Sequence, residues 1–122
     1  MTPRETPRIL LVEDEADIRT TLDVLLTLAG FEVVVACDGI DGLAACATET
    51  PDLVVLDVGL PGMDGWEVLR RLRLDSAVPV LVLTAHGLEA VRDRALAAGA
   101  DAAMAKPFRH DELIEVLRSL LG

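Results

Sequence analysis

The chain has 122 residues, of which 52% are hydrophobic, and a formal net charge of -10 at pH 7. This length suits one domain with a sizeable core, and the apolar content excludes a disordered chain. So acidic a surface repels phosphate backbones, and no apolar run is long enough for a membrane span. We therefore expect no direct nucleic-acid binding and no membrane insertion. The first residues lack the apolar core of a signal peptide, which predicts a cytoplasmic protein.

Five apolar runs alternate with five segments of helical periodicity. After a lead at residues 1–7, expected to be disordered, the chain is predicted to form a single domain over residues 8–122. The apolar runs predict strands at residues 8–12, 31–36, 53–56, 80–83 and 102–105. The helical spacing predicts five helices: one ending at Gly30, one near residues 40–48, one capped by Asp64, and two near residues 88–98 and 110–121.

Strict alternation of strand and helix, with strands apolar on both faces, predicts a parallel sheet covered by helices on both sides. Five units are too few to close an eight-stranded barrel. An open, doubly wound sheet remains. Functional groups in such a sheet gather at the carboxyl ends of the strands, near the point where the strand order reverses.

Polar residues stand at the carboxyl ends of four predicted strands. Glu13 and Asp14 follow the first strand, and Asp57 follows the third. Thr84 follows the fourth strand, and Lys106, the only lysine among 11 basic residues, follows the fifth. Because these ends share one edge of a parallel sheet, we expect three carboxylates, a hydroxyl and an ammonium to converge there.

Three clustered carboxylates repel one another unless their pKa values rise or a cation lies among them. Carboxylate oxygens completed by water are the ligands that Mg²⁺ prefers. One carboxylate could then attack phosphorus while the metal, Lys106 and Thr84 share the phosphoryl oxygens. Simpler readings stay open for single residues: Asp14 as a helix N-cap, Thr84 as a cap, and Lys106 as a surface residue.

Taken together, these motifs resemble the receiver domain of bacterial two-component response regulators over about residues 8–121. The resemblance rests on four motifs: Glu13-Asp14, Asp57 followed by Leu60-Pro61-x-x-Asp64-Gly65, Thr84-Ala85, and Lys106-Pro107-Phe108. It implies a flavodoxin-like fold with strand order 2-1-3-4-5. It also implies a signalling module that catalyses at most its own phosphorylation and dephosphorylation.

By this resemblance, Asp57 accepts a phosphoryl group from the phosphohistidine of a sensor histidine kinase or phosphotransfer protein. Asp14, Asp57 and the backbone carbonyl of Gly59 would bind Mg²⁺, and Glu13 would act through metal-bound water. A downstream effector would dock on the face formed by the fourth helix, the fifth strand and the fifth helix.

Further residues complete the expected switch. Thr84 would hydrogen-bond the phosphoryl group, and Lys106 would pair first with the phosphoacceptor and then with the phosphoryl group. The peptide bond between Lys106 and Pro107 is expected to be cis, as X–Pro bonds can be. His86, two residues after Thr84, flanks the expected water path and could modulate dephosphorylation.

The sequence departs from the family pattern at Ala103. An aromatic residue usually occupies this position, three residues before the lysine, and swings inward as the threonine moves. The chain contains no tyrosine at all. The usual aromatic switch is therefore absent, which favours as an alternative a receiver-like scaffold that is not phosphorylated. A phosphohydrolase using an aspartyl-phosphate is a further alternative, although Gly59 stands where such enzymes often have a general acid.

Two smaller expectations concern cysteine and arginine. Cys37 and Cys46 are the only cysteines, and no metal-binding spacing surrounds them, so we expect both to be reduced core residues. Arg70, Arg71 and Arg73 are expected to lie on the solvent face of their helix.

Overall fold

The computed structural model describes residues 6–58, 64–85 and 88–122. Its strands are β1 (Arg8–Val12), β2 (Glu32–Ala36), β3 (Leu53–Asp57), β4 (Val80–Thr84) and β5 (Ala102–Ala105). Its helices are α1 (Ala16–Leu28), α2 (Gly39–Glu49), α3 (Gly65–Asp75), α4 (Leu88–Ala97) and α5 (His110–Leu121). The predicted alternation of strand and helix is confirmed.

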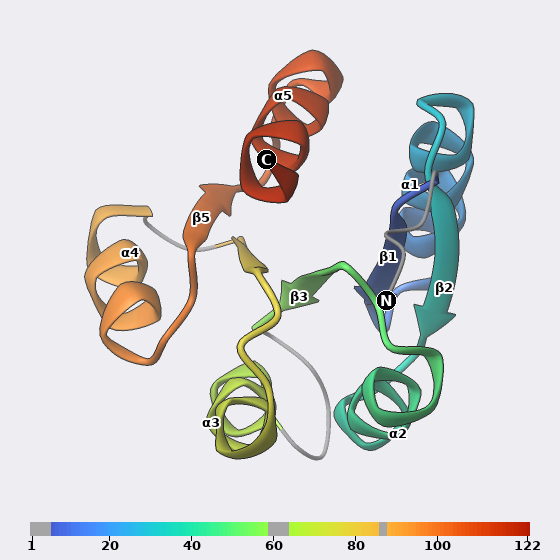
Figure 1. The fold of residues 1–122 in the computed structure, drawn as a ribbon. Helices are drawn as coiled ribbons and strands as arrows, with labels where there is room; N and C mark the ends of the chain where they lie inside the picture. Colours follow the sequence, from blue (N-terminus) through green and yellow to red (C-terminus); the bar gives the residue numbers. More distant parts are fainter. Residues whose placement is uncertain (1–5, 59–63, 86–87) are drawn as a thin grey trace.

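The five strands form one parallel sheet with the order β2-β1-β3-β4-β5 (Figure 1). The order reverses between β1 and β3, because β1 pairs with β2 on one side and with β3 on the other. Val12 lies beside Ala36 and Leu56 in this register, so neighbouring strands end at the same edge. The predicted open, doubly wound sheet is confirmed, and its carboxyl edge collects the residues that follow each strand.

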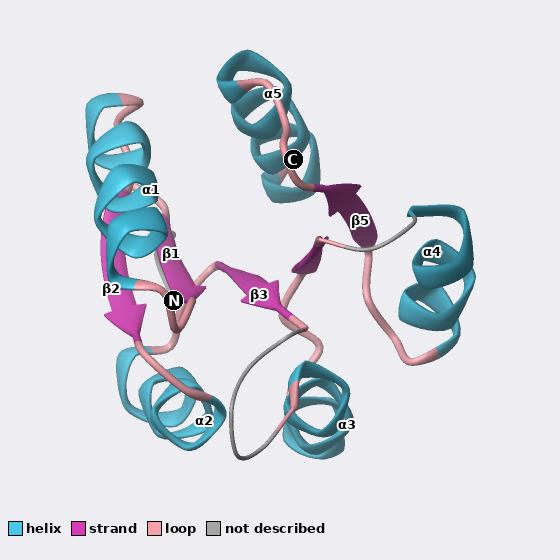
Figure 2. Ribbon diagram, turned by 180° about the vertical axis from the view of Figure 1, so that it is seen from behind, coloured by secondary structure: helices cyan, strands magenta, loops and turns pink. Residues whose placement is uncertain are grey.

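Helices cover both faces of the sheet (Figures 1 and 2). Alternate strand residues point to opposite faces. Accordingly, Leu10 and Val12 belong to a core cluster shared with residues of α2, α3 and α4. Ile9 and Leu11 belong to a second cluster shared with α1 and α5. The central strands are therefore held on both sides, which fixes the direction in which their last residues point.

The outer strand β2 is shorter than predicted. Phe31 lies outside it, because its N–H donates to the carbonyl of Leu26 (3.1 Å) and closes the end of α1. Gly30, with φ of 99°, supplies the left-handed turn that this ending requires. Of residues 1–7 the structure describes only the last two, and the Pro7 carbonyl accepts a hydrogen bond from the N–H of Glu32 (2.9 Å).

The expectation that both cysteines are core residues is wrong for Cys37. Cys37 is exposed, because it follows the edge strand β2, and its thiol donates to Asp41 (3.2 Å). Cys46 is half-buried and packs against the core cluster that contains Leu10 and Val12, so the expectation of a core residue is met only in part.

Arg73 does not share the solvent face of α3 with Arg70 and Arg71. Its Nε donates to the carbonyl of Gly99 (2.9 Å), and its Nη2 pairs with Asp101 (3.2 Å). Arg73 thus ties the end of α3 to the connection between α4 and β5. Among the described residues, no helix has both the length and the apolar character needed to cross a membrane.

Candidate functional site

Asp57 is the last residue of β3 and is 8% exposed. The four strand residues before it are buried between the two helical layers. The next residue, Val58, makes one further hydrogen bond to the neighbouring strand β4, from its N–H to the carbonyl of Leu83 (3.2 Å). The sequence places a carboxylate at this point of the sheet edge, and the surrounding core holds its backbone in place.

Glu13 and Asp14 reach the same edge from the end of β1. The N–H of Glu13 donates to the carbonyl of Ala36 (3.0 Å), and the Glu13 side chain is 1% exposed. Glu13, Asp14 and Asp57 each offer one carboxylate oxygen, and these oxygens lie within 4.8 Å of one another. Hard oxygen ligands gathered this closely suit a divalent cation that they would hold directly or through water.

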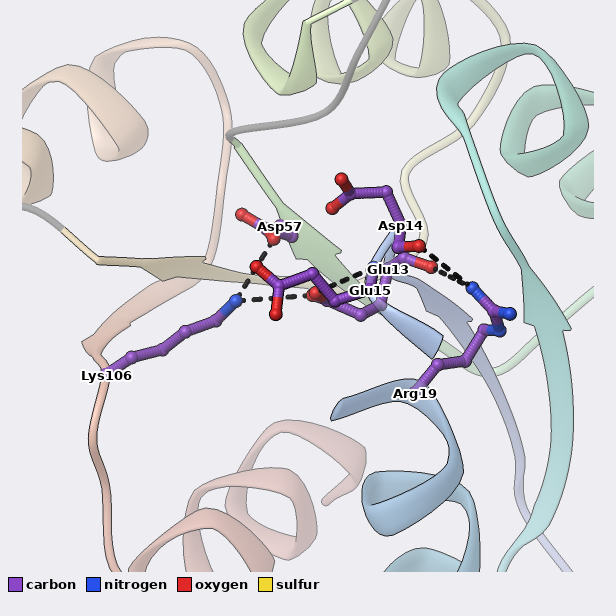
Figure 3. A network of polar contacts seen from close by, with 6 residues as sticks. All are labelled: Glu13, Asp14, Glu15, Arg19, Asp57 and Lys106. Carbon is purple, nitrogen blue, oxygen red and sulfur yellow. Dashed lines mark hydrogen bonds and ion pairs between the residues drawn. The ribbon is translucent and has the colours of Figure 1, made fainter. Parts of the chain in front are cut away.

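Lys106 supplies the positive charge of this cluster (Figure 3). Its Nζ lies 3.0 Å from Asp57 Oδ2 and 3.3 Å from Glu13 Oε2. The side chain comes from the end of β5, and the peptide bond to Pro107 is cis, as expected. The convergence predicted from the strand ends is therefore present: a lysine ammonium bridges carboxylates from two other strands.

Burial and charge shift the acid–base equilibria here. Burial is the main cause that raises the pKa of Glu13 from 4.5 to about 7; the Asp57 carboxylate adds to the rise, and Lys106 opposes it. Burial lowers the pKa of Lys106, but its bonds and charge interactions with Asp57 and Glu13 outweigh burial, so the net shift is upward. Without a divalent cation, the raised pKa values keep Lys106 charged and let Glu13 hold its proton up to about pH 7.

Thr84 completes the edge at the end of β4. It is 1% exposed, and its carbonyl accepts a hydrogen bond from the N–H of Lys106 (2.7 Å). The ends of β4 and β5 are thus joined beside the carboxylates. Ala103, at the position of the expected aromatic residue, is 7% exposed and belongs to the same core cluster as Ala95 of α4.

The structure also tests the capping roles considered for two aspartates. Asp14 is not the N-cap of α1: that position belongs to Glu15, which makes no side-chain capping bond. Asp64 does cap α3, since its Oδ1 accepts from the N–H of Glu67 (2.9 Å). The proposed contributions of Gly59 and His86 fall outside the described residues.

Two further residues, Arg19 and Gly65, contact the backbone beside the site. Arg19 donates from Nη1 to the carbonyls of Glu13 (3.0 Å) and Asp14 (3.3 Å). Gly65 lies so close to the chain leaving the site that an added Cβ would be 2.3 Å from Val58 Cα. Gly65 belongs to the motif after Asp57 that the sequence analysis identified. Arg19 belongs to no such motif, and only its position one turn into the helix after the acid pair could have suggested a role.

Curated proteins align with nearly the whole chain. It is 46% identical over 114 residues to the probable transcriptional regulator ycf27 of Cyanophora paradoxa, covering 93% of this chain and 48% of that protein. It is 41% identical over 117 residues to the transcriptional regulatory protein PrrA of Mycobacterium tuberculosis, covering 95% and 50%. The chain thus spans about half the length of the curated relatives that it matches.

Solved structures and a family model agree with this relationship. The receiver domain of the Francisella response regulator 1452 superposes with a TM-score of 0.91 at 30% identity, covering 95% of this chain and 97% of that one. The chemotaxis protein CheY4 of Vibrio cholerae has a TM-score of 0.88 at 30% identity, covering 94% and 98%. The model of the response regulator receiver domain matches residues 9–118. This match covers all five strands except Arg8, the first residue of β1. The chain therefore belongs to the response regulator receiver domain family.

Proposed function

We propose that this chain is the phosphoacceptor module of a two-component phosphorelay, with Asp57 as the residue that becomes phosphorylated. One observation carries the proposal: Lys106 Nζ lies 3.0 Å from Asp57 at the edge where Glu13 and Asp14 also converge. Such an edge combines a nucleophilic carboxylate, hard oxygen ligands for a cation and a fixed positive charge. Phosphoryl transfer to a carboxylate uses these three components.

The proposed donor is the phosphohistidine of a sensor histidine kinase or of a phosphotransfer protein. A carboxylate oxygen of Asp57 forms the new O–P bond while the N–P bond breaks and the imidazole nitrogen keeps the bonding electron pair. The proposed ligands of Mg²⁺ are Asp14, Asp57 and the Gly59 carbonyl, with Glu13 acting through water. When bound, the ion would neutralise negative charge on the phosphoryl oxygens.

Lys106 and Thr84 are proposed to hold the phosphoryl group after transfer. A lysine ammonium on a flexible stem can follow the negative charge from the carboxylate to a phosphoryl oxygen. The Thr84 hydroxyl would donate to another of these oxygens. The N–H of Lys106 donates to the carbonyl of Thr84 (2.7 Å), so a displacement of one strand end would also displace the other. His86 is retained as a proposed modulator on the basis of sequence alone.

We further propose that the output is a change in partner affinity and that the chain acts on no external substrate beyond its phosphodonor. The relatives ycf27 and PrrA are named as transcriptional regulators, and the chain spans about half of each. A downstream effector that responds to the α4–β5–α5 face is therefore the proposed partner. The opposing proposal, a scaffold that is not phosphorylated, is favoured by Ala103 alone.

A mass measurement separates these two proposals. Incubation with a small phosphodonor and Mg²⁺ should raise the intact mass of the protein by one phosphoryl group. Asp57→Asn should abolish the increase. Asp64→Asn is the matched control, because asparagine keeps the capping function and removes an acid close in sequence. An unmodified wild-type protein, or an Asp57→Asn variant that is modified as fully as wild type, would contradict the phosphoacceptor role.

A further inference from the structure

Arg19 is the described side chain that holds the backbone of the acid pair from the side opposite to Lys106 (Figure 3). It is the fourth residue of α1, and its N–H donates to the Glu15 carbonyl (2.9 Å) in the first turn of this helix. From there its Nη1 reaches back to the carbonyls of Glu13 (3.0 Å) and Asp14 (3.3 Å). One guanidinium nitrogen thus spans two consecutive peptide groups.

Other contacts in the connection between β1 and α1 hold its first residue and the Glu13 side chain, which pairs with Lys106 at 3.3 Å. Glu15 occupies the N-cap position without a side-chain capping bond. The contact from the Glu15 N–H to Glu13 Oε1 is long, at 3.4 Å. The bond from the N–H of Glu13 to the Ala36 carbonyl fixes where the connection begins. Arg19 adds the bonds to the two carbonyls of the acid pair, Glu13 and Asp14.

We propose that Arg19 is a positioning residue for the metal-binding acids: by pinning the carbonyls of Glu13 and Asp14, it presents both carboxylates toward Asp57. This inference rests on the proposed Mg²⁺ site. Its physical basis is that peptide orientation sets the direction in which the attached side chains leave the backbone. A residue that orients metal ligands without touching the metal commonly controls affinity through such second contacts.

Charge and geometry give opposite predictions for the loss of Arg19. A guanidinium near the site repels a divalent cation, so its removal on electrostatic grounds alone would strengthen Mg²⁺ binding. Loss of positioning would weaken binding, because the carboxylates must then be ordered at the moment the ion binds. Contacts that orient metal ligands typically contribute about 10–100-fold in affinity, and we expect the geometric effect to exceed the screened repulsion.

Two variants test the proposal. Arg19→Gln introduces a shorter, neutral side chain, and Arg19→Met removes every hydrogen-bond donor. Glutamine and methionine are both good helix formers. The dissociation constant for Mg²⁺ would be measured by the fluorescence of Trp66 and by titration calorimetry. Both variants should bind Mg²⁺ about tenfold more weakly than wild type. The loss should persist at high monovalent salt, which screens charge effects and leaves geometry unchanged.

Arg71→Gln is the charge-matched control. Arg71 is exposed and pairs with Glu67. It lines a groove together with Pro51, which precedes β3 and so lies at the edge of the sheet opposite to the site acids. This variant should keep wild-type affinity for Mg²⁺. Unchanged or tighter Mg²⁺ binding in the folded Arg19 variants would overturn the positioning role. Absence of Mg²⁺ binding by wild type would instead overturn the metal site itself, so the two failures can be told apart.

Discussion

Burial at the sheet edge imposes an electrostatic penalty on the carboxylate of Glu13. Its side chain is 1% exposed, and it shares Lys106 with Asp57. Burial and the neighbouring carboxylate raise its pKa to about 7. In the unfolded chain the same group has a pKa near 4.5. Because its folded-state pKa is the higher one, Glu13 favours folding less and less as the pH rises from 4.5 to about 7.

When a chelator removes divalent cations, Glu13→Gln should therefore change the free energy of unfolding, relative to wild type, more favourably at pH 8 than at pH 5. One pKa unit corresponds to about 1.4 kcal/mol, so the difference between the two pH values should exceed about 1 kcal/mol. Urea unfolding of wild type and variant at both pH values measures it. Exposed Glu115 supplies the control Glu115→Gln. An equal effect of Glu13→Gln at pH 5 and pH 8 would show that Glu13 is not the titrating group.

At the scale of elements, α3 connects the site to α4. Its first residue, Gly65, fits against the chain leaving Asp57, where an added Cβ would be 2.8 Å from the Asp57 carbonyl oxygen. Trp66 follows, and the guanidinium of Arg94 in α4 lies 4.2 Å from the centre of its rings. At the far end of α3, Arg73 contacts Gly99 beyond α4. The first turn of α3 thus touches both the site and α4, without an aromatic residue in β5.

The contact between Trp66 and Arg94 should be measurable as a coupling free energy. A cation over an indole at a partly exposed site contributes about 0.5–1 kcal/mol. A double-mutant cycle with Trp66→Leu, Arg94→Met and both together should return a coupling of this size in chemical unfolding. Arg92→Met, an exposed arginine on the same helix, should show no coupling to Trp66. Additive effects of the Trp66 and Arg94 changes, within about 0.3–0.5 kcal/mol, would contradict a direct interaction.

The sequence predicted the elements well because each strand contains a run of four apolar residues with a polar residue at its end or close behind it. The same pattern placed Asp57, Thr84 and Lys106 at one edge, since only parallel topology was needed to bring them together. Contacts between segments distant in the chain could not be predicted. Arg73 belongs to a helical face that looks polar, and its partner Gly99 lies 26 residues away. Likewise, nothing local indicated that Arg19 would turn back toward the acid pair.

At the scale of the whole molecule, the net charge of -10 complicates any test for the metal. An acidic protein repels itself, so any salt that screens its surface increases stability to some degree. A specific ion acts differently, because it binds the folded state at one place and its effect follows the concentration relative to the dissociation constant. The described residues contain two acid-rich groups with suitable spacing: the site acids, and Cys37 with Asp38 and Asp41.

Mg²⁺ should raise the free energy of unfolding well beyond NaCl at matched ionic strength. At a hundredfold excess over the dissociation constant, linkage predicts about 2.7 kcal/mol for one site. Asp14→Asn should remove most of this specific increment, because it takes one carboxylate from the site. Asp41→Asn, which alters the second group, should retain it. Equal stabilisation by the two salts in wild type would mean that the carboxylates act only as surface charge. Loss of the increment in Asp41→Asn alone would place the ion at α2 instead of at the end of β3.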